Sequence, residues 1–200
     1  LDLDKNKIGR LEKIIITSRD PAPPTRSYLK SSGGIFRDMM IHDFDLCRYY
    51  LKNDEISEIS SSASSFEPFY RKIKDYELAT VTMKSKKGVI CIITNSRHCS
   101  FGYDQRVELF GSKGMIISEN KRNDEISFYS NKTTSGKSPL MHFFVERYKD
   151  AYKKQLYDFA KFIKKNIKPL ALFEEGRRAL IMANAAKKSI ISKRIEKLNF

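Results

Sequence analysis

The sequence predicts an α+β fold, in which helices cover one face of a mainly antiparallel open sheet. The expected elements run in the order strand, helix, a succession of strands and then two helices, which differs from the regular alternation of a parallel α/β fold. Two short connections, Lys86-Lys87-Gly88 and residues 111–114, join successive strands as antiparallel hairpins do. With 200 residues, 40% of them hydrophobic, we expect one domain over residues 1–200.

The net charge of +14 indicates either a nucleic-acid or membrane surface, or a solvated basic exterior. The lysines are spread over strands, turns and helices, and the chain has no recognisable nucleic-acid-binding motif. This dispersal favours the solvated exterior, so we expect no nucleic acid and no membrane among the partners. No apolar run approaches the length that spans a bilayer, and the N-terminal residues do not form a signal peptide.

The three cysteines are Cys47, Cys91 and Cys99. They share no spacing typical of metal ligands, and their odd number does not suit a disulfide framework. We therefore expect free thiols, no metal site and a cytoplasmic location.

The first expected strand runs from Leu11 to Ser18, after a lead-in over residues 1–10 that turns at residues 7–10. Residues 19–24 contain three prolines, so they leave the sheet as a rigid extended loop. Arg19 and Asp20 stand at the end of the strand, where polar side chains often line a site. A salt-bridged turn explains these two residues equally well.

The central element is a helix expected between Ser31 and Lys52, beginning where Gly33 and Gly34 bend the chain. On a helical wheel its apolar residues cover a wide arc, so the helix should be largely buried. That arc holds Ile35, Phe36, Met39, Met40, Phe44, Leu46, Cys47, Tyr50 and Leu51. The opposite face therefore looks into a cleft.

Asp38, His42 and Asp45 lie on that opposite face, within roughly 60° of one another. An imidazole exchanges protons near neutral pH, and a neighbouring carboxylate can orient it or accept hydrogen bonds from a sugar hydroxyl. We interpret His42 as an acid/base group and the two aspartates as substrate ligands. A structural set of ion pairs without chemistry is equally compatible with the wheel. Asp43 points into the apolar arc, so we expect it to make a structural tie to hydrogen-bond donors.

Six further strands are expected over residues 56–66, 76–84, 89–99, 106–110, 115–118 and 125–129. Gly102 permits a bend before the fourth of these, and Tyr103 either offers its hydroxyl to a ligand or packs at the strand end. Residues 111–114 lack the spacing of a phosphate-binding loop.

Two helices should close the chain after the polar loop at residues 131–139. The first carries an apolar stripe over residues 143–165, and the second opens near Phe173. Ala179, Ala183 and Ala186 give the second helix a small-residue face for close packing. Because Ile90, Ile92, Val107 and Leu109 are strongly apolar, we also expect a homo-oligomer through the uncovered sheet face.

The run GGIFRDMMIHDFD, residues 33–45, resembles the substrate-domain motif of the Gfo/Idh/MocA oxidoreductases, in particular their myo-inositol 2-dehydrogenase branch. Further matching segments are residues 17–24, 102–108 and 110–115, together with Arg147-Tyr148 and Ala151-Tyr152. The matches follow the family's order and span nearly the whole chain.

This resemblance implies that Asp38 and His42 act with a lysine to deprotonate the reacting hydroxyl of a polyol or sugar, and that Asp20 and Tyr103 contact the substrate. It also implies an N-terminal Rossmann domain that binds NAD or NADP. The chain has no Gly-x-Gly-x-x-Gly loop after its first strand and no counterpart of the family's lysine motif. We therefore expect it to be the C-terminal substrate-binding and oligomerisation domain, inactive alone, with the cofactor bound mainly by the missing domain.

Two other functions stay open on the sequence. The chain is alternatively a non-catalytic module that binds a polyol or supports assembly, which ligand binding independent of His42 would indicate. It is alternatively a basic nucleic-acid-binding domain, for which binding should weaken steeply as salt increases.

Overall fold

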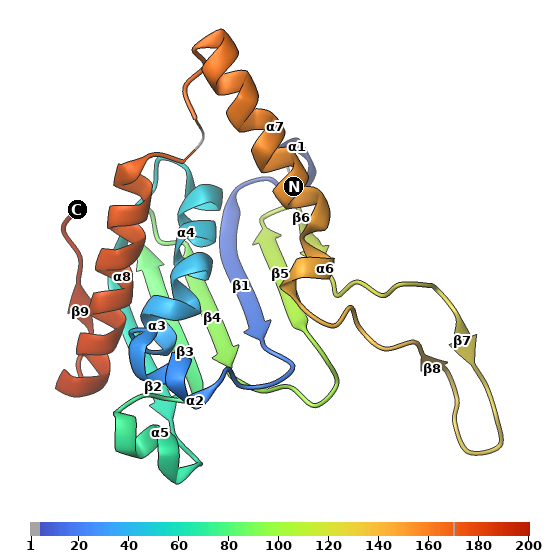
Figure 1. Cartoon of the computed structure of the whole chain (residues 1–200). Coiled ribbons are helices and arrows are strands. Elements are labelled where there is room, and N and C mark those ends of the chain that lie inside the picture. Colours follow the sequence, from blue (N-terminus) through green and yellow to red (C-terminus); the bar gives the residue numbers. More distant parts are fainter. Residues whose placement is uncertain (1–4, 170) are drawn as a thin grey trace.

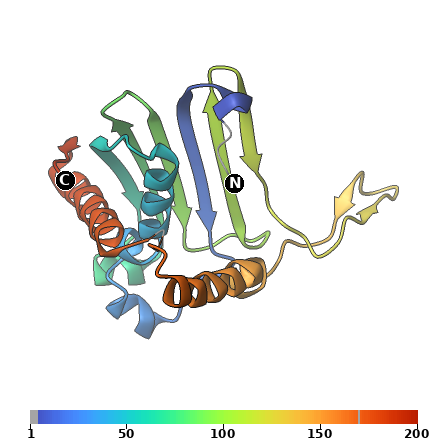
Figure 2. The ribbon, with the colours of Figure 1, turned by 90° about the horizontal axis from the view of Figure 1, so that it is seen from above.

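The computed structural model describes residues 5–169 and 171–200, and its main feature is a seven-stranded sheet in the order β6-β5-β1-β4-β3-β2-β9 (Figure 1). Its strands are β1 (Leu11–Arg19), β2 (Ile56–Ser64), β3 (Leu78–Ser85), β4 (Ile90–Ser96), β5 (Asp104–Gly111), β6 (Gly114–Ser118) and β9 (Glu196–Lys197). A separate two-stranded ribbon is formed by β7 (Ser127–Phe128) and β8 (Gly136–Lys137). Figures 1 and 2 both show this ribbon projecting away from the sheet.

The helices are α1 (Lys5–Ile8), α2 (Arg26–Ser31), α3 (Ile35–Asp38), α4 (Met40–Leu51), α5 (Pro68–Ile73), α6 (Phe144–Arg147), α7 (Lys149–Lys165) and α8 (Phe173–Ser192). Three of them, α3, α4 and α8, pack together over one face of the sheet (Figure 1). The predicted α+β fold, with a mainly antiparallel sheet and helices on one face, is confirmed. None of the helices in residues 5–169 and 171–200 combines the length and low charge that a bilayer span requires.

One pair of strands departs from the antiparallel pattern. β1 lies between β5 and β4, antiparallel to the first and parallel to the second. The parallel pairing is possible because a long connection, which includes α4 and the β2–β3 hairpin, separates β1 from β4 in the sequence. As a result, the carboxyl ends of β1 and β4 meet at the same edge, where Arg19 is paired with Ser96.

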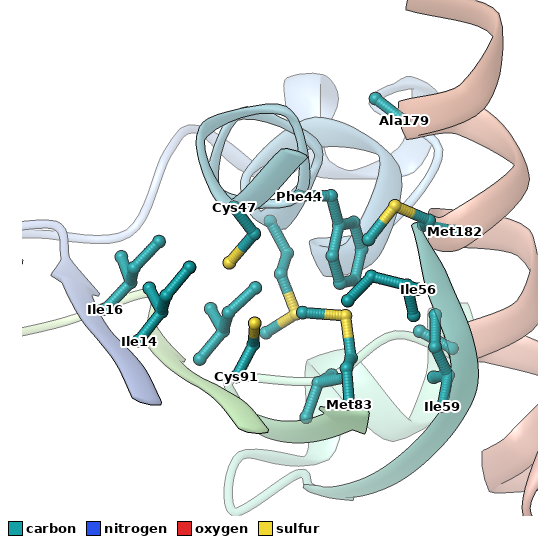
Figure 3. Close-up of a cluster of buried hydrophobic side chains, with 14 of the residues drawn as sticks. Ile14, Ile16, Phe44, Cys47, Ile56, Ile59, Met83, Cys91, Ala179 and Met182 are labelled. Atoms are coloured by element: carbon teal, nitrogen blue, oxygen red, sulfur yellow. The ribbon is translucent and has the colours of Figure 1, made fainter. Parts of the chain in front are cut away.

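The core lies between the sheet and the helices α4 and α8 (Figure 3). Phe44 and Cys47 of α4 and Met182 of α8 are fully buried against sheet residues such as Ile14. The predicted small-residue face of α8 is buried as well, comprising Ala179, Ala183 and Ala186. These short side chains allow α8 to approach α4 and β2 closely.

The long helix expected from Ser31 to Lys52 is instead divided. The break lies at Met39, between α3 and α4, where φ is −106°. The helix expected over residues 143–165 is divided in the same way at Tyr148. Hydrophobic periodicity continues across both breaks, so the pattern alone does not reveal them.

Three short helices, α1, α2 and α5, were not predicted. α2 follows the proline-rich loop and begins after Thr25, whose hydroxyl oxygen accepts a hydrogen bond from the backbone N–H of Tyr28 at 3.4 Å. α5 begins at Pro68, a favoured first helical residue, and the strand expected over 56–66 ends before it, at Ser64.

The strand expected over 125–129 is reduced to β7. In the lead-in, residues 1–4 lie outside the described residues, and Gly9, with φ of +71°, turns the chain from α1 into β1.

The four apolar residues taken to favour a sheet-mediated oligomer lie on different faces. Ile90 and Ile92 point away from the helices, whereas Leu109 is fully buried on the helix-covered face and Val107 packs partly buried on the same side. Side chains alternate along each strand, so residues of opposite parity on β4 and β5 reach opposite faces once the register is set. The exposed apolar residues of the open face are Ile90, Phe110, Met115 and Ile117.

Candidate functional site

An open cavity of about 1430 Å³ lies beside the carboxyl end of β1. Its walls come from the loop after β1, from α4, from β5 and from the α6–α7 segment. All five residues that the sequence singled out line this cavity, namely Asp20, Asp38, His42, Asp45 and Tyr103. The fold therefore gathers them at one place, as a shared site requires.

Asp38 is the last residue of α3 and is held on both carboxylate oxygens. The Tyr28 hydroxyl donates a hydrogen bond to Oδ1, and Arg97 Nη1 donates one to Oδ2. The hydrogen bond to Asp38, followed by burial, raises the pKa of Tyr28 above its usual value. Asp38 is thus anchored by two donors before any ligand arrives.

His42 follows one helical turn later, in the first turn of α4, and its side chain is exposed toward the cavity. Within the described residues this side chain makes no hydrogen bond and no ion pair, so the structural alternative, in which helical neighbours hold the imidazole by ion pairs, is not what the structure contains. Asp45 lies near by, half-exposed, 3.5 Å from Arg48 in an ion pair. Both ring nitrogens of His42 are therefore available to a ligand.

Asp20 owes its position to the parallel pairing of β1 and β4. Its backbone N–H donates to the Ser96 carbonyl at 3.0 Å, which holds the chain at the sheet edge. Burial raises the pKa of Asp20 to about 6, with Arg97 acting in the opposite direction and Asp38 adding to the rise. The salt-bridged turn considered for Arg19 and Asp20 does not form, because Arg19 pairs with Asp104 at 3.0 Å.

Tyr103 is buried at the far wall of the cavity. Its ring packs edge-on against Phe143, with centroids 5.5 Å apart, and against Tyr148 at 6.3 Å. Burial and then the proximity of Tyr148 raise the pKa of the Tyr103 hydroxyl. Tyr103 therefore packs at the strand end and lines the cavity at the same time.

Asp43 points away from His42 into the protein, as its place in the apolar arc indicates. Its side chain accepts hydrogen bonds from Ser18 Oγ at 2.8 Å and from Asn95 Nδ2 at 2.9 Å, which form the expected structural tie. Complete burial raises the pKa of Asp43 to about 6, although both hydrogen bonds lower it. Asp43 also contributes to the cavity floor, which the sequence did not indicate.

Several lining residues were missed by the sequence analysis, and the most deeply buried charged one is Arg97, with 1% of its surface exposed. Arg97 follows β4 directly and reaches Asp38 across 59 positions of the chain. No local spacing links two residues so far apart. Arg147, noted only for its resemblance, donates from Nη2 to the carbonyls of Gln105 at 2.8 Å and Glu119 at 3.1 Å, and so ties α6 to the sheet edge.

A metal centre finds no support among the described residues. No cluster of three or more His, Cys, Asp or Glu side chains able to hold an ion occurs in that part of the chain. Cys47, Cys91 and Cys99 are all buried free thiols. The polar groups of the cavity include carboxylates, hydroxyls, guanidinium groups and the imidazoles of His42 and His142, which suit hydrogen bonding to a polyhydroxylated ligand.

Comparison with known proteins adds independent information. Residues 3–117 match the family model described as the GFO/IDH/MocA C-terminal domain. The chain is 41% identical over 197 residues to the myo-inositol 2-dehydrogenase of Thermotoga maritima, and the match covers 98% of this chain. It is 29% identical over 169 residues, 84% of the chain, to a scyllo-inositol 2-dehydrogenase (NAD(+)) of Bacillus subtilis.

Among solved structures, the chain superposes on a myo-inositol dehydrogenase from Corynebacterium glutamicum with a TM-score of 0.94 and 41% identity. That match covers 98% of this chain and 59% of the other. The chain likewise spans 58% of the Thermotoga maritima relative and 48% of the Bacillus subtilis relative.

Proposed function

The chain belongs to the GFO/IDH/MocA family, whose C-terminal domain it matches, and we propose that it is the substrate-binding domain of an NAD-dependent dehydrogenase. The proposed reaction oxidises a secondary hydroxyl of a cyclic polyol to a ketone, with myo-inositol as the first candidate substrate. The observation that carries this proposal is the shared cavity that Asp38 and His42 line with Asp20 and Asp45. Similarity to myo-inositol dehydrogenases over 98% of the chain supports the choice of substrate class.

In this proposal each side chain has a role that its surroundings suit. His42, which has no partner in the described residues, takes the proton from the reacting hydroxyl oxygen. Asp38, already held by Tyr28 and Arg97, stabilises the imidazolium or accepts a hydrogen bond from the polyol. Asp20, Asp45 and Tyr103 bind the remaining hydroxyls along the cavity wall.

The cavity also suits the reacting end of a nicotinamide cofactor. Its volume of about 1430 Å³ exceeds the range of typical small-molecule pockets, so it leaves room beside a bound polyol. A bound NAD supplies the hydride acceptor of the reaction. NAD is the first choice because one relative is an NAD(+)-dependent scyllo-inositol 2-dehydrogenase, and NADP is the alternative.

We propose further that the dinucleotide is held mainly by a separate nucleotide-binding domain, and that residues 1–200 form the C-terminal domain. The apolar residues of α7 support this arrangement, since Leu156, Phe159 and Ile163 are 71%, 59% and 65% exposed. Within the described chain no side chain of α7 is buried, although the helix is strongly amphipathic. α7 begins beside the cavity, where Tyr152 lines the wall, so a domain delivering the cofactor there would also cover this stripe.

The open sheet face supports a homo-oligomer. Ile90 on β4, Phe110 on β5, and Met115 and Ile117 on β6 expose between 42% and 49% of their surface on this face. A second copy of the chain would bury them through the same surface on both subunits. Free buried thiols suit a reducing compartment, and we propose a cytoplasmic location on that ground.

Ligand binding to the chain tests the proposed function. A ligand that binds only the folded state raises the melting temperature, because it stabilises that state by RT ln(1 + [L]/Kd). We expect myo-inositol or another cyclic polyol to raise the melting temperature of the chain, and Asp38→Asn to abolish the increase. The matched control is Asp150→Asn on the exposed surface of α7, and the polyol should raise the melting temperature of this variant as it does for the parent. Equal stabilisation of both variants would refute the assignment of this cavity.

A further inference from the structure

Arg97 occupies an unusual position for an arginine. It is the first residue after β4, and its backbone N–H donates to the Glu77 carbonyl at 2.8 Å. Its side chain turns inward and is 1% exposed, yet it contributes to the wall of the cavity. A fully buried guanidinium is rare in proteins unless it is paired with carboxylates.

The guanidinium connects the two ends of the short helix α3. At one end, Nη1 donates to Oδ2 of Asp38, the last residue of α3. At the other end, Nη2 lies 3.8 Å from Asp75 Oδ2, while Asp75 Oδ1 accepts the backbone N–H of Ile35 at 2.9 Å. One buried cation thus anchors both the first and the last residue of α3.

If its role were only structural, this arrangement would cost folding free energy. Within the described residues, Nε and Nη2 of Arg97 are buried without a hydrogen-bond partner. Unpaired buried donors destabilise a fold, and a buried ion pair is often no more stable than apolar side chains of similar volume. The presence of a buried charge here is better explained by its ion pair with Asp38, which holds that carboxylate in place, than by packing.

Within the described residues, the groups that form an ion pair with Arg97 or have a pKa that its charge shifts are acids and phenols. Asp38, Asp20 and Tyr28 line the cavity, whereas Asp75 and Tyr70 lie outside its lining. The positive charge of Arg97 lowers the pKa of Asp20, Tyr28 and Tyr70, in each case against the larger effects that raise it. It is therefore the central cation of an acidic cluster that includes the cavity floor.

We propose that Arg97 is a positioning residue of the polyol site. It holds the Asp38 carboxylate at the break between α3 and α4, and so fixes the placement of Asp38 relative to His42 one turn later. Arg97 acts through Asp38 and does not itself exchange a proton with the substrate. This inference rests on the proposed function, because the value of a fixed Asp38 lies in the reaction at that site.

The test uses two variants in the full-length protein, Arg97→Met and Arg97→Lys, with Arg178→Met as the matched control. Arg178 also forms ion pairs, with Glu55 and Glu174, but lies outside the cavity. Because a misplacement of about 1 Å can cost roughly 100-fold in rate, we expect Arg97→Met to lower kcat/KM for myo-inositol by about that factor. We expect a smaller loss for Arg97→Lys, which keeps the charge but not the planar fork.

The pH profile separates positioning from a loss of stability. Removing the cation raises the pKa of Asp20 further, so the acidic limb of kcat/KM should move to higher pH in Arg97→Met and stay in place in Arg178→Met. A folded Arg97→Met protein with unchanged kcat/KM and an unchanged acidic limb would overturn the inference. If Arg97→Met does not fold, Arg97→Lys decides: unchanged kinetics refute the inference and a reduced kcat/KM supports it.

A crystal structure of Arg97→Lys distinguishes this inference from the proposed function. We expect Asp38 and the first turn of α4 to be displaced, and an unmoved Asp38 would contradict the positioning role whatever the activity. If the unmodified protein oxidises no cyclic polyol, the proposed function is refuted. The position of Asp38 in Arg97→Lys then still tests whether Arg97 positions Asp38.

Discussion

The cavity sets His42 apart from the acids around it. Asp38 is bound by two donors and Asp43 by two more, whereas His42 has no partner among the described residues. An unpaired imidazole at a polar cavity is suited to proton exchange with a ligand. The proposed division of roles between the aspartates and His42 is therefore consistent with how each side chain is held.

His42→Ala should remove the acid/base group with little effect on the fold, because the side chain is exposed. We expect kcat to fall by about 10²–10⁴ in the full-length protein, which is the usual contribution of general acid–base catalysis. His98→Ala is the control, since His98 is also exposed but does not line the cavity. A similar kcat in both variants would assign the proton transfer to another group.

Asp43 should make the stability of the chain depend on pH. Its pKa in the folded state is about 6 against 3.8 for the unperturbed group, so between these values the folded state binds the extra proton. The contribution of Asp43 to the free energy of unfolding therefore falls as pH rises from about 4 to about 6. Asp43→Asn removes this dependence.

Urea unfolding of the parent and of Asp43→Asn at pH 4 and pH 7 measures the effect. The difference in free energy of unfolding between the two proteins should change by on the order of 3 kcal/mol in favour of the variant at the higher pH. Asp124→Asn is a useful control, because hydrogen bonds lower the pKa of Asp124 and its change should be small and of opposite sign. If the difference in unfolding free energy between the two proteins does not change with pH, the pKa of Asp43 is not raised in the folded state.

The short helix α3 depends on the residue that precedes it. Gly34 has a φ of +89°, and a Cβ added there would lie 2.9 Å from Asp75 Oδ1. That oxygen accepts the first N–H of α3 and belongs to the carboxylate beside Arg97. The conformation of Gly34 and the anchoring of Asp38 are therefore linked through Asp75.

Gly34→Ala and Gly88→Ala form a matched pair that isolates this contact. Both glycines have φ near +90°, but a Cβ at Gly88 meets nothing within 4 Å. Each variant bears the strain of a side chain at positive φ, and only Gly34→Ala also disturbs Asp75. We expect Gly34→Ala to lose about 1–2 kcal/mol more free energy of unfolding than Gly88→Ala. Equal losses of unfolding free energy in the two variants, measured by thermal or urea unfolding, would show that the contact with Asp75 does not contribute.

The sequence was informative where structure is local. Strand composition and hairpin connections predicted most strands and the α+β class, and helical periodicity brought Asp38, His42 and Asp45 to one side. Periodicity did not reveal the breaks at Met39 and Tyr148, because apolar spacing continues through both.

Contacts between segments far apart in the chain could not be predicted from the sequence. The Arg97–Asp38 pair depends on the parallel register of β1 and β4, which a single sequence does not specify. For the same reason, the sequence did not reveal that Val107 and Leu109 face the helices, because the strand register decides which face of the sheet each residue lies on.

In the described part of the chain, the open sheet face and the stripe of α7 both expose apolar side chains. The first suits a second copy of the chain and the second suits the nucleotide-binding domain. In this arrangement the cavity, which α4 and the α6–α7 segment line, lies on the helix-covered side of the sheet, opposite the proposed subunit contact.

Ile117→Glu tests the sheet interface. Ile117 is 45% exposed on β6, and a charge placed in an apolar contact costs several kcal/mol. We expect sedimentation to show an oligomer for the parent and a dissociation constant raised by about 100-fold or more for the variant. The control is Lys187→Glu on the exposed surface of α8. A monomeric parent at micromolar concentration would refute the sheet-mediated oligomer.

The central claim is that this domain supplies the polyol-binding half of an NAD-dependent reaction. It is tested most directly by the rate at which the full-length protein reduces NAD with myo-inositol, compared with the rate for residues 1–200 alone. We expect reduction that requires both the polyol and the full-length protein, and none by residues 1–200. Reduction by residues 1–200 alone, or no reduction by the full-length protein with any cyclic polyol, would contradict the claim.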